Sequence, residues 1–223
     1  MKPLVVAIDG PASAGKSTVA KQIAKDFNYI YVDTGAMYRC ATLLAERNHL
    51  VFNDGKAIVE ALKNGNLTFR QEADGQHVYF DDEDITLAIR MPEINAHVSE
   101  VASLEEVRHY LVSLQQAYGE KGGLVMDGRD IGTCVFPNAD VKIFLVASVE
   151  ERAERRHKEN LEKGIPSDLE QLKVDIARRD HLDETREISP LTKAKDAILV
   201  DTTGMSIEDV VAKIEGIMKE KEG

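Results

Sequence analysis

The fold is decided near the N-terminus by the stretch Gly10-Pro11-Ala12-Ser13-Ala14-Gly15-Lys16-Ser17-Thr18. This stretch follows the apolar run Leu4-Val5-Val6-Ala7-Ile8 and precedes a helical pattern, so it matches the G-x-x-x-x-G-K-[ST] phosphate loop between a strand and a helix. Its two glycines let the backbone turn so that N–H groups face phosphate oxygens. Lys16 can reach the outer phosphates, and the Ser17 hydroxyl can ligate a magnesium ion that bridges them. Residues 10–18 are therefore predicted to bind ATP.

Strand and helix patterns alternate outward from this loop. Val19, Ile23 and Phe27 recur every four residues and predict a helix that ends near Asp26. Residues 29–32 then predict a strand, and residues 36–47 predict a helix with Thr34 as its cap. Further strands are expected at 124–126, 141–146 and 198–200, and Ser206 with Asp209 opens a terminal helix. The chain is expected to be an α/β protein with a five-stranded parallel sheet flanked by helices.

Residues 64–90 interrupt this alternation. Leu67 and Phe69 alternate with polar residues, Asp74-Gly75 offers a turn, and Val78 and Phe80 alternate again. The pattern predicts a small antiparallel hairpin with an edge segment near residue 85. A long surface loop remains the alternative.

Residues 94–118 return to helical spacing and predict one long helix that ends before Gly122-Gly123. The next strand delivers Asp127-Gly128-Arg129-Asp130 at its carboxyl end, where open parallel sheets bind ligands. Asp127 could hold magnesium through water, and Arg129 could clamp a phosphate. The alternative is a turn whose acidic side chains cap nearby backbone groups.

Arginine is concentrated late in the chain, because seven of the twelve arginines fall between Arg129 and Arg186. A helix predicted to start at Ser167, with Glu170 completing a capping box, carries an inward stripe that is first apolar and then charged. That stripe consists of Leu169, Leu172, Ile176, Arg179, Asp183 and Arg186. It predicts either a polar pocket or a solvated helix face, and the spacing does not choose between them.

A second group of arginines, Arg152, Arg155 and Arg156, precedes Gly164-Ile165-Pro166. Such a group is either a solvated helix face or a mobile lid that closes arginines over a phosphoryl group.

The composition limits the class of protein. With 223 residues and 43% hydrophobic residues, the chain can form one sizeable core. The net charge of −11 disfavours nucleic-acid binding, and the five-residue apolar run near the N-terminus is far shorter than the roughly 20 residues that span a bilayer. Two cysteines and six scattered histidines form no disulfide framework or metal-binding pattern. We expect a soluble, cytoplasmic protein that binds no membrane.

Together these motifs resemble the bacterial cytidylate kinases, the CMP/dCMP branch of the nucleoside monophosphate kinases. The resemblance covers essentially the whole chain. The segments that carry it are residues 8–11, 33–39, 127–133, 135–137 and 139–145, then Arg179 to Arg186 followed by Pro190-Leu191.

The resemblance implies transfer of a phosphoryl group from ATP, with Mg²⁺, to CMP or dCMP by a monomer. It implies a single kinase domain with a core (about 1–33, 119–150 and 190–223), a monophosphate-binding region containing the small sheet (about 34–118) and a lid (about 152–166). It assigns the nucleoside to Thr34, Ser99, Arg108 and Asp130, the acceptor phosphate to Arg39, Arg129 and Arg186, and the ribose to Arg179 and Asp183. The residues expected to be catalytic are Lys16, Arg129, Arg152, Arg156 and Arg186.

Two other functions remain open at this point. One is a kinase of the same architecture that acts on a shikimate-like or gluconate-like hydroxyl and needs a general base. The other is a nucleotide-gated binding module that hydrolyses ATP slowly. Both predict activity or binding that does not depend on a nucleoside monophosphate.

Overall fold

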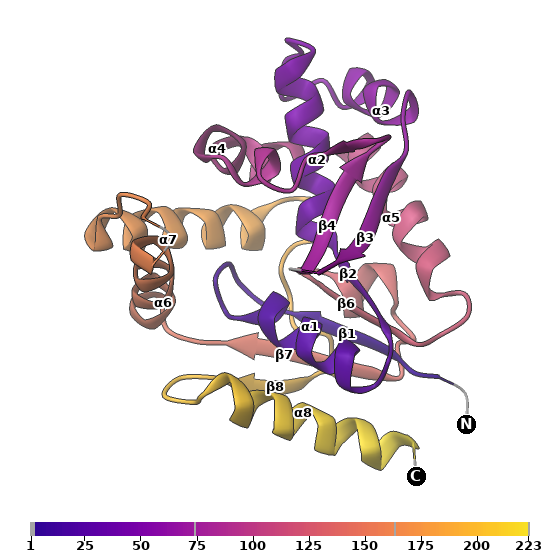
Figure 1. Ribbon diagram of the computed structural model, residues 1–223, viewed down its shortest axis with the longest axis vertical. Coiled ribbons are helices and arrows are strands. Elements are labelled where there is room, and N and C mark those ends of the chain that lie inside the picture. Colours follow the sequence, from indigo (N-terminus) through magenta and orange to yellow (C-terminus); the bar gives the residue numbers. More distant parts are fainter. Residues whose placement is uncertain (1–2, 74, 163, 223) are drawn as a thin grey trace. The chain divides into compact units, whose positions relative to one another are not determined.

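The computed structural model describes residues 3–73, 75–162 and 164–222 (Figure 1). The chain divides into two compact units, one formed by residues 1–31 and 118–223 and the other by residues 32–117. Each unit is described by itself.

The first unit is built on a five-stranded sheet with the order β2-β6-β1-β7-β8. Its strands are β1 (Val5–Asp9), β2 (Ile30–Asp33), β6 (Leu124–Gly128), β7 (Val141–Val146) and β8 (Ile198–Asp201). The central strand β1 pairs in parallel with both β6 and β7, and β7 pairs in parallel with β8. The predicted parallel sheet is confirmed, and it places the segment after β1 beside the segment after β6.

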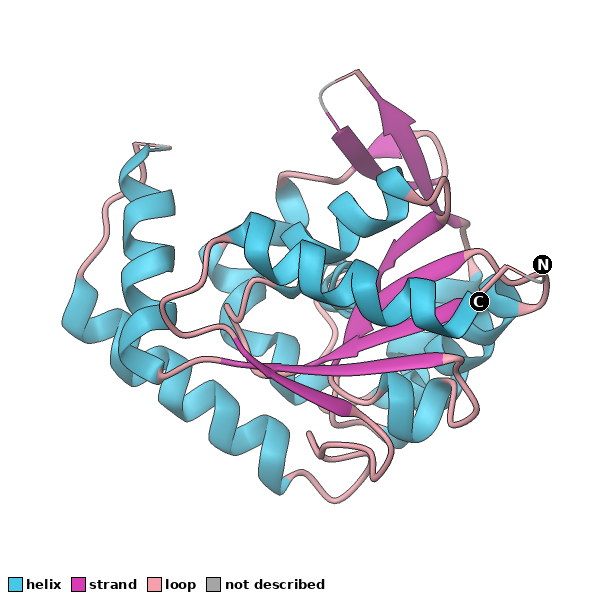
Figure 2. Cartoon of the chain, turned by 90° about the horizontal axis from the view of Figure 1, so that it is seen from below, coloured by secondary structure: helices cyan, strands magenta, loops and turns pink. Residues whose placement is uncertain are grey.

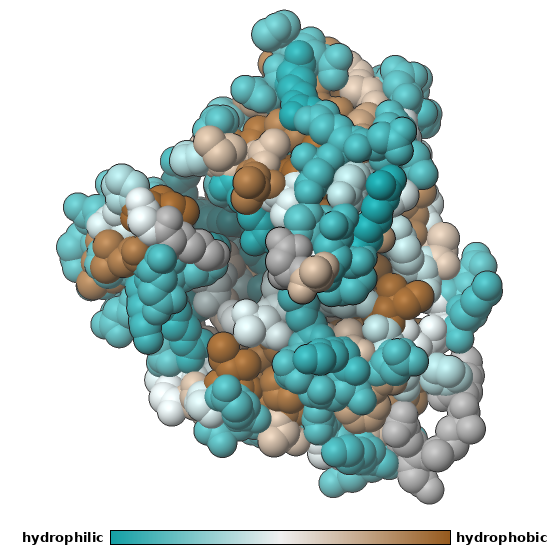
Figure 3. Space-filling view, viewed as in Figure 1, coloured by the Kyte–Doolittle hydropathy of each residue, from teal (hydrophilic) through white to brown (hydrophobic). Residues whose placement is uncertain are grey.

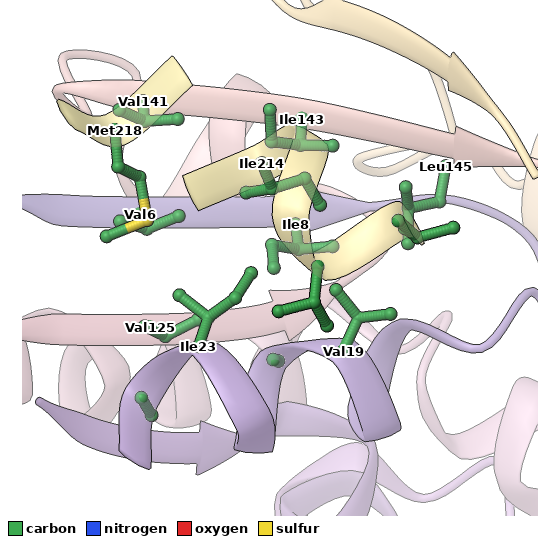
Figure 4. Close-up of a cluster of buried hydrophobic side chains, with 14 of the residues drawn as sticks. Val6, Ile8, Val19, Ile23, Val125, Val141, Ile143, Leu145, Ile214 and Met218 are labelled. Atoms are coloured by element: carbon green, nitrogen blue, oxygen red, sulfur yellow. The ribbon is translucent and has the colours of Figure 1, made fainter. Parts of the chain in front are cut away.

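Helices of this unit cover the sheet and extend from it. They are α1 (Lys16–Asp26), α6 (Val149–Glu162), α7 (Leu169–Thr185) and α8 (Ile207–Glu222), with a π-helical turn η2 (Ile131–Val135) after β6. Figure 4 shows α1 and α8 directing buried apolar side chains at the same side of the sheet. The side chains labelled there are Val6, Ile8, Val19, Ile23, Val125, Val141, Ile143, Leu145, Ile214 and Met218. This apolar layer packs the strand before the phosphate loop against the helix after it.

The second unit is mostly helical. Its helices are α2 (Thr34–Arg47), α3 (Gly55–Lys63), η1 (Ala88–Arg90), α4 (Pro92–Val101) and α5 (Glu105–Gly119). A separate sheet contains β3 (Leu67–Glu72), β4 (Gly75–Phe80) and β5 (Glu83–Asp84), and β3 and β4 are the adjacent antiparallel arrows of Figure 2. The predicted hairpin is confirmed and the loop alternative is wrong, while Asp74 of its expected turn lies outside the described residues.

Three local predictions are wrong. The expected long helix 94–118 is two helices, since the chain turns at residues 102–104 between α4 and α5. Asp33 rather than Thr34 caps α2, because its carboxylate accepts from the Ala36 N–H at 2.9 Å. Asp168 rather than Ser167 caps α7 by accepting from the Gln171 N–H. In both corrected caps an ionised acceptor replaces a neighbouring hydroxyl, as the positive helix N-terminus favours.

The visible surface is largely polar. Figure 3 shows one face of the molecule, mostly hydrophilic with separate hydrophobic areas. No helix in the described part of the chain is both long enough and apolar enough to cross a membrane.

Candidate active site

The phosphate loop connects β1 to α1 through two left-handed glycines. Gly10 has φ +150° and Gly15 has φ +84°, and a Cβ at Gly10 would lie 2.1 Å from the Leu145 carbonyl oxygen. Gly15 caps α1 without a side-chain hydrogen bond, so the N–H groups of the first turn are not satisfied by a cap. A helix N-terminus of this kind binds phosphate.

Lys16 is the first residue of α1 and is only 5% exposed. Its Nζ donates to the Pro11 carbonyl oxygen at 2.6 Å. Burial lowers the pKa of Lys16 well below its ordinary value, and the nearby positive charge of Arg129 lowers it further. A phosphate anion beside this amine would favour its charged form, so the site is prepared for an anionic ligand.

Two oxygen groups meet where magnesium was predicted. The Ser17 hydroxyl donates to Asp127 Oδ2 at 2.9 Å, and the Tyr31 hydroxyl donates to Asp127 Oδ1 at 2.7 Å. A hydroxyl and a carboxylate are the hard ligands that Mg²⁺ prefers, and it takes few protein ligands when phosphates supply the rest. Within the described residues no group of three or more His, Cys, Asp or Glu could hold a metal ion. The residues present therefore fit a magnesium ion that arrives with a nucleotide.

Charged residues predicted from separate motifs come together after β6. Arg129 Nε donates to Asp183 Oδ2 at 2.7 Å, which joins the segment after β6 to α7. Burial acts to lower the pKa of Arg129, but the Asp183 carboxylate outweighs it and the pKa is raised. Burial also opposes ionisation of Asp183, yet Arg129, Arg179 and Arg186 together hold its pKa below the ordinary value.

The charged end of the α7 stripe is thus directed inward. Arg186 Nη2 lies 3.7 Å from Asp130 Oδ1, and both side chains are 5% exposed. The polar-pocket interpretation of this stripe is the correct one for these residues, and the solvated-face interpretation is wrong.

Asp9 is a residue of the site that the sequence analysis missed. It is 4% exposed, and its two carboxylate oxygens accept from the Ile131 and Gly132 N–H groups, each at 2.8 Å. Burial raises the pKa of Asp9 to about 6, although these two backbone hydrogen bonds lower it. Asp9 fastens the backbone of the segment after β6 next to the first glycine of the phosphate loop.

The two arginines of the predicted lid that were expected to be catalytic differ in their surroundings. Arg152 is 4% exposed and donates to the carbonyl oxygens of Ala147 and Ala12 and to Asp180. Arg156 is half-buried, and its Nη1 lies 3.3 Å from Glu159. Asp180 was also missed, because the only indication for it is its position four residues after Ile176 on the buried side of α7.

The remaining predicted site residues belong to the second unit. Thr34 is the first residue of α2 and is buried, and Ser99 lies half-buried in α4. Arg39 Nε donates to Asn95 Oδ1 at 3.2 Å. Arg108 is 2% exposed, donates to the Ala102 carbonyl oxygen and lies 5.4 Å from the centre of the Tyr38 ring. Arg108 thus places a buried guanidinium beside the Tyr38 ring.

Comparisons with known proteins agree with this geometry. A protein-family model described as cytidylate kinase matches residues 6–220. A cytidylate kinase of Enterococcus faecalis (strain ATCC 700802 / V583) is 55% identical over 221 residues, covering 99% of this chain and 98% of the relative. A cytidylate kinase of Streptococcus sanguinis (strain SK36) is 59% identical over 216 residues, covering 96% of each chain.

Solved structures share the fold at much lower identity. An uncharacterized protein from Eubacterium ventriosum ATCC 27560 aligns with a TM-score of 0.51 at 10% identity, covering 97% of this chain and 98% of the other. A gluconokinase from Sinorhizobium meliloti 1021 aligns with a TM-score of 0.50 at 13% identity, covering 99% and 95%. At these identities the likeness concerns the fold alone.

Proposed function

Because this chain belongs to the cytidylate kinase family, we propose that it transfers the γ-phosphoryl group of ATP to the 5′-phosphate of CMP and dCMP. The products are ADP with CDP or dCDP. The observation that carries the proposal within the molecule is that one unit holds both a phosphate loop after β1 and a buried set of arginines and aspartates. These residues lie after the neighbouring strand β6 and near the C-terminal end of α7.

The donor is bound by residues 10–18. Backbone N–H groups and Lys16 neutralise the phosphates of ATP, and the start of α1 adds its positive end. Ser17 and Asp127 would hold Mg²⁺, which neutralises phosphate charge on ATP when it is bound.

The acceptor is bound through arginines. Arg39, Arg129 and Arg186 hold its phosphate, while Arg179 and Asp183 contact the ribose. A phosphate monoester has a second pKa of about 6, so at neutral pH it is already an anionic nucleophile. The reaction therefore needs no general base, and the arginines serve by offsetting charge as the new bond forms.

The base is recognised by Ser99, Arg108 and Asp130, with Thr34 beside the nucleoside. Cytosine carries an exocyclic amine where uracil carries an acceptor oxygen. The Asp130 carboxylate can accept from that amine, and it would be left facing an acceptor if uracil took its place. This difference favours CMP over UMP.

The lid, about residues 152–166, which includes most of α6, completes the proposal. Arg152 and Arg156 stabilise the transferring phosphoryl group when it closes, and closure excludes water. We further propose a cytoplasmic protein, because its substrates are intracellular nucleotides, and a monomer, as the family resemblance implies. The net charge of −11 disfavours binding to nucleic acid.

ADP formation from Mg-ATP should be measured in parallel with CMP, dCMP, UMP, AMP and no acceptor. The proposal expects activity concentrated on CMP and dCMP. Activity that does not depend on a monophosphate would instead support the binding-module function. A kinase of a shikimate-like or gluconate-like hydroxyl is not favoured by the family match.

A further inference from the structure

Arg152 and Asp180 form a buried ion pair that touches the phosphate loop only through its backbone. Arg152 Nη2 lies 2.6 Å from Asp180 Oδ2, and the two side chains are 4% and 12% exposed. The Asp180 Oδ1 accepts from the Ala12 N–H at 3.4 Å, and Arg152 Nη1 donates to the Ala12 carbonyl oxygen at 2.8 Å. Asp180 thus binds the backbone N–H of Ala12, and Arg152 binds the carbonyl oxygen of the same residue.

The residue that they hold precedes a strained one. Ser13 has φ +59°, a left-handed conformation that strains the backbone of a non-glycine residue. Such a conformation persists only where the surroundings impose it. Ala12 has no polar side chain, so only its backbone groups can form the hydrogen bonds that fix the loop at this point.

The two members of the pair come from different helices. Arg152 lies in the first turn of α6 and Asp180 in the middle of α7, and these two helices pack against each other (Figure 1). A buried ion pair is weak evidence for stability, since desolvation offsets its attraction. It does fix geometry, and here that geometry joins α6 and α7 to the phosphate loop.

We propose that Asp180 is a positioning residue for phosphoryl transfer. With Arg152 it clamps Ala12, keeps the phosphate loop in its binding conformation and couples that conformation to α6 and α7. Because the pair is neutral overall, it does this without placing net negative charge beside the triphosphate. The inference rests on the proposed function, since it concerns how ATP is received in that reaction.

The test compares Asp180→Asn with the wild-type enzyme. The variant leaves a carbonyl oxygen for the Ala12 N–H but removes the charge that pairs with Arg152. We expect the KM for ATP to rise about tenfold, the size of one lost charge-assisted hydrogen bond, while the KM for CMP at saturating ATP changes less than about twofold. We also expect the Ala12 amide to exchange its hydrogen about tenfold faster, as followed by NMR of the full-length protein.

Asp175→Asn is the matched control, because Asp175 lies on the same helix, is exposed and bonds only to Gln171 among the contacts seen. It should change neither KM nor the exchange of Ala12. If Asp180→Asn leaves Arg152 unpaired and fails to fold, the double variant Arg152→Gln, Asp180→Asn removes both buried charges together. It should fold and show the same rise in KM for ATP, together with a fall in kcat because Arg152 is also proposed to stabilise the transferring phosphoryl group.

Unchanged exchange of Ala12 and an unchanged KM for ATP in the folded variant would overturn the proposal, and the pair would then serve only the packing of α6 on α7. Failure of the proposed function looks different. A wild-type protein without CMP-dependent ADP formation would refute that function, whereas the Ala12 exchange would still report whether Asp180 clamps the loop.

Discussion

The phosphate loop and the segment after β6 both continue neighbouring strands of the same sheet, yet they are built for ligands in opposite ways. The phosphate loop offers backbone N–H groups, so most of its residues are small and its charge is confined to Lys16. The segment at 127–135 offers charged side chains, and its backbone is fastened by the Asp9 carboxylate. In the proposed function the donor side therefore binds mainly with its main chain and the acceptor side with its side chains.

This difference teaches where substitutions should act. On the donor side, the Arg152 and Asp180 pair holds the loop from outside, and Lys16 bonds to the Pro11 carbonyl oxygen within the loop. On the acceptor side, the proposed function has each charged residue contact the ligand directly, so its loss should affect one substrate and leave the other. Kinetics measured for ATP and CMP separately can therefore separate the two regions.

The largest effect is expected from Lys16→Met. It removes the buried cation of the donor side, and kcat/KM for ATP should fall roughly 10³-fold. Steady-state kinetics at saturating CMP measures this. Lys25→Met, at an exposed position of the same helix, should retain nearly full activity. Loss of CMP affinity without loss of transfer from ATP would break the assignment of Lys16 to the donor side.

Arg186→Ala tests the acceptor side. It removes a buried guanidinium 3.7 Å from Asp130, and turnover of CMP should fall roughly 10²-fold with ATP binding nearly intact. ATP binding by calorimetry and turnover by coupled assay give the two values. Arg178→Ala, on the exposed side of α7, is the control. Equal loss of ATP affinity would show that Arg186 is misplaced.

Asp9→Asn tests the fastening between the two regions through pH. Burial raises the pKa of Asp9 from 3.8 to about 6, so the folded protein favours the protonated acid. The stability that this group contributes is present below about pH 4 and is lost as the pH rises to about 6, by about 3 kcal/mol from the size of the pKa change.

The measurement for Asp9 is urea unfolding of the wild type and of Asp9→Asn at several pH values from 4 to 7. The difference in unfolding free energy between the two proteins should change across this range, because only the wild type carries the titrating group. A difference in unfolding free energy that stays constant with pH would contradict the prediction, because it would mean that the pKa of Asp9 is not raised by folding.

The smallest effect is expected from Asp130→Asn. The amide can donate to the uracil oxygen as well as accept from cytosine, so the preference for CMP over UMP should fall about tenfold. The ratio of kcat/KM for the two monophosphates measures it. An unchanged ratio would remove Asp130 from base recognition and confine the acceptor side to phosphate and ribose.

The comparison also explains which parts of the site the sequence could predict. Residues 10–18 were predictable because glycine, lysine and serine at fixed spacing have few other uses. Arg129 and Asp183 were expected from family motifs, although only the structure shows that they pair. Asp9 and Asp180 could not be predicted, since each acts on backbone groups more than a hundred residues away and has no spacing of its own.

The fold shows the same division. Strands of the central sheet were predictable from short apolar runs, and the 67–80 hairpin from alternation about a turn. The break between α4 and α5 was not, because Val101 and Leu104 keep the apolar spacing of one continuous helix while the backbone turns. The spacing of apolar residues predicts which side of a helix is buried. It does not predict a turn between two helices that keep the same side buried.

Gly10 has a further consequence for how this protein can change over evolutionary time. A side chain there would collide with the Leu145 carbonyl oxygen on β7, so this glycine is required for two strands to meet as well as for phosphate to enter. A descendant that had lost every catalytic arginine would still have to keep it. A divergent relative that keeps Gly10 would therefore be expected to share the fold. Only a lysine at the position of Lys16 would indicate that it also shares the binding of phosphate.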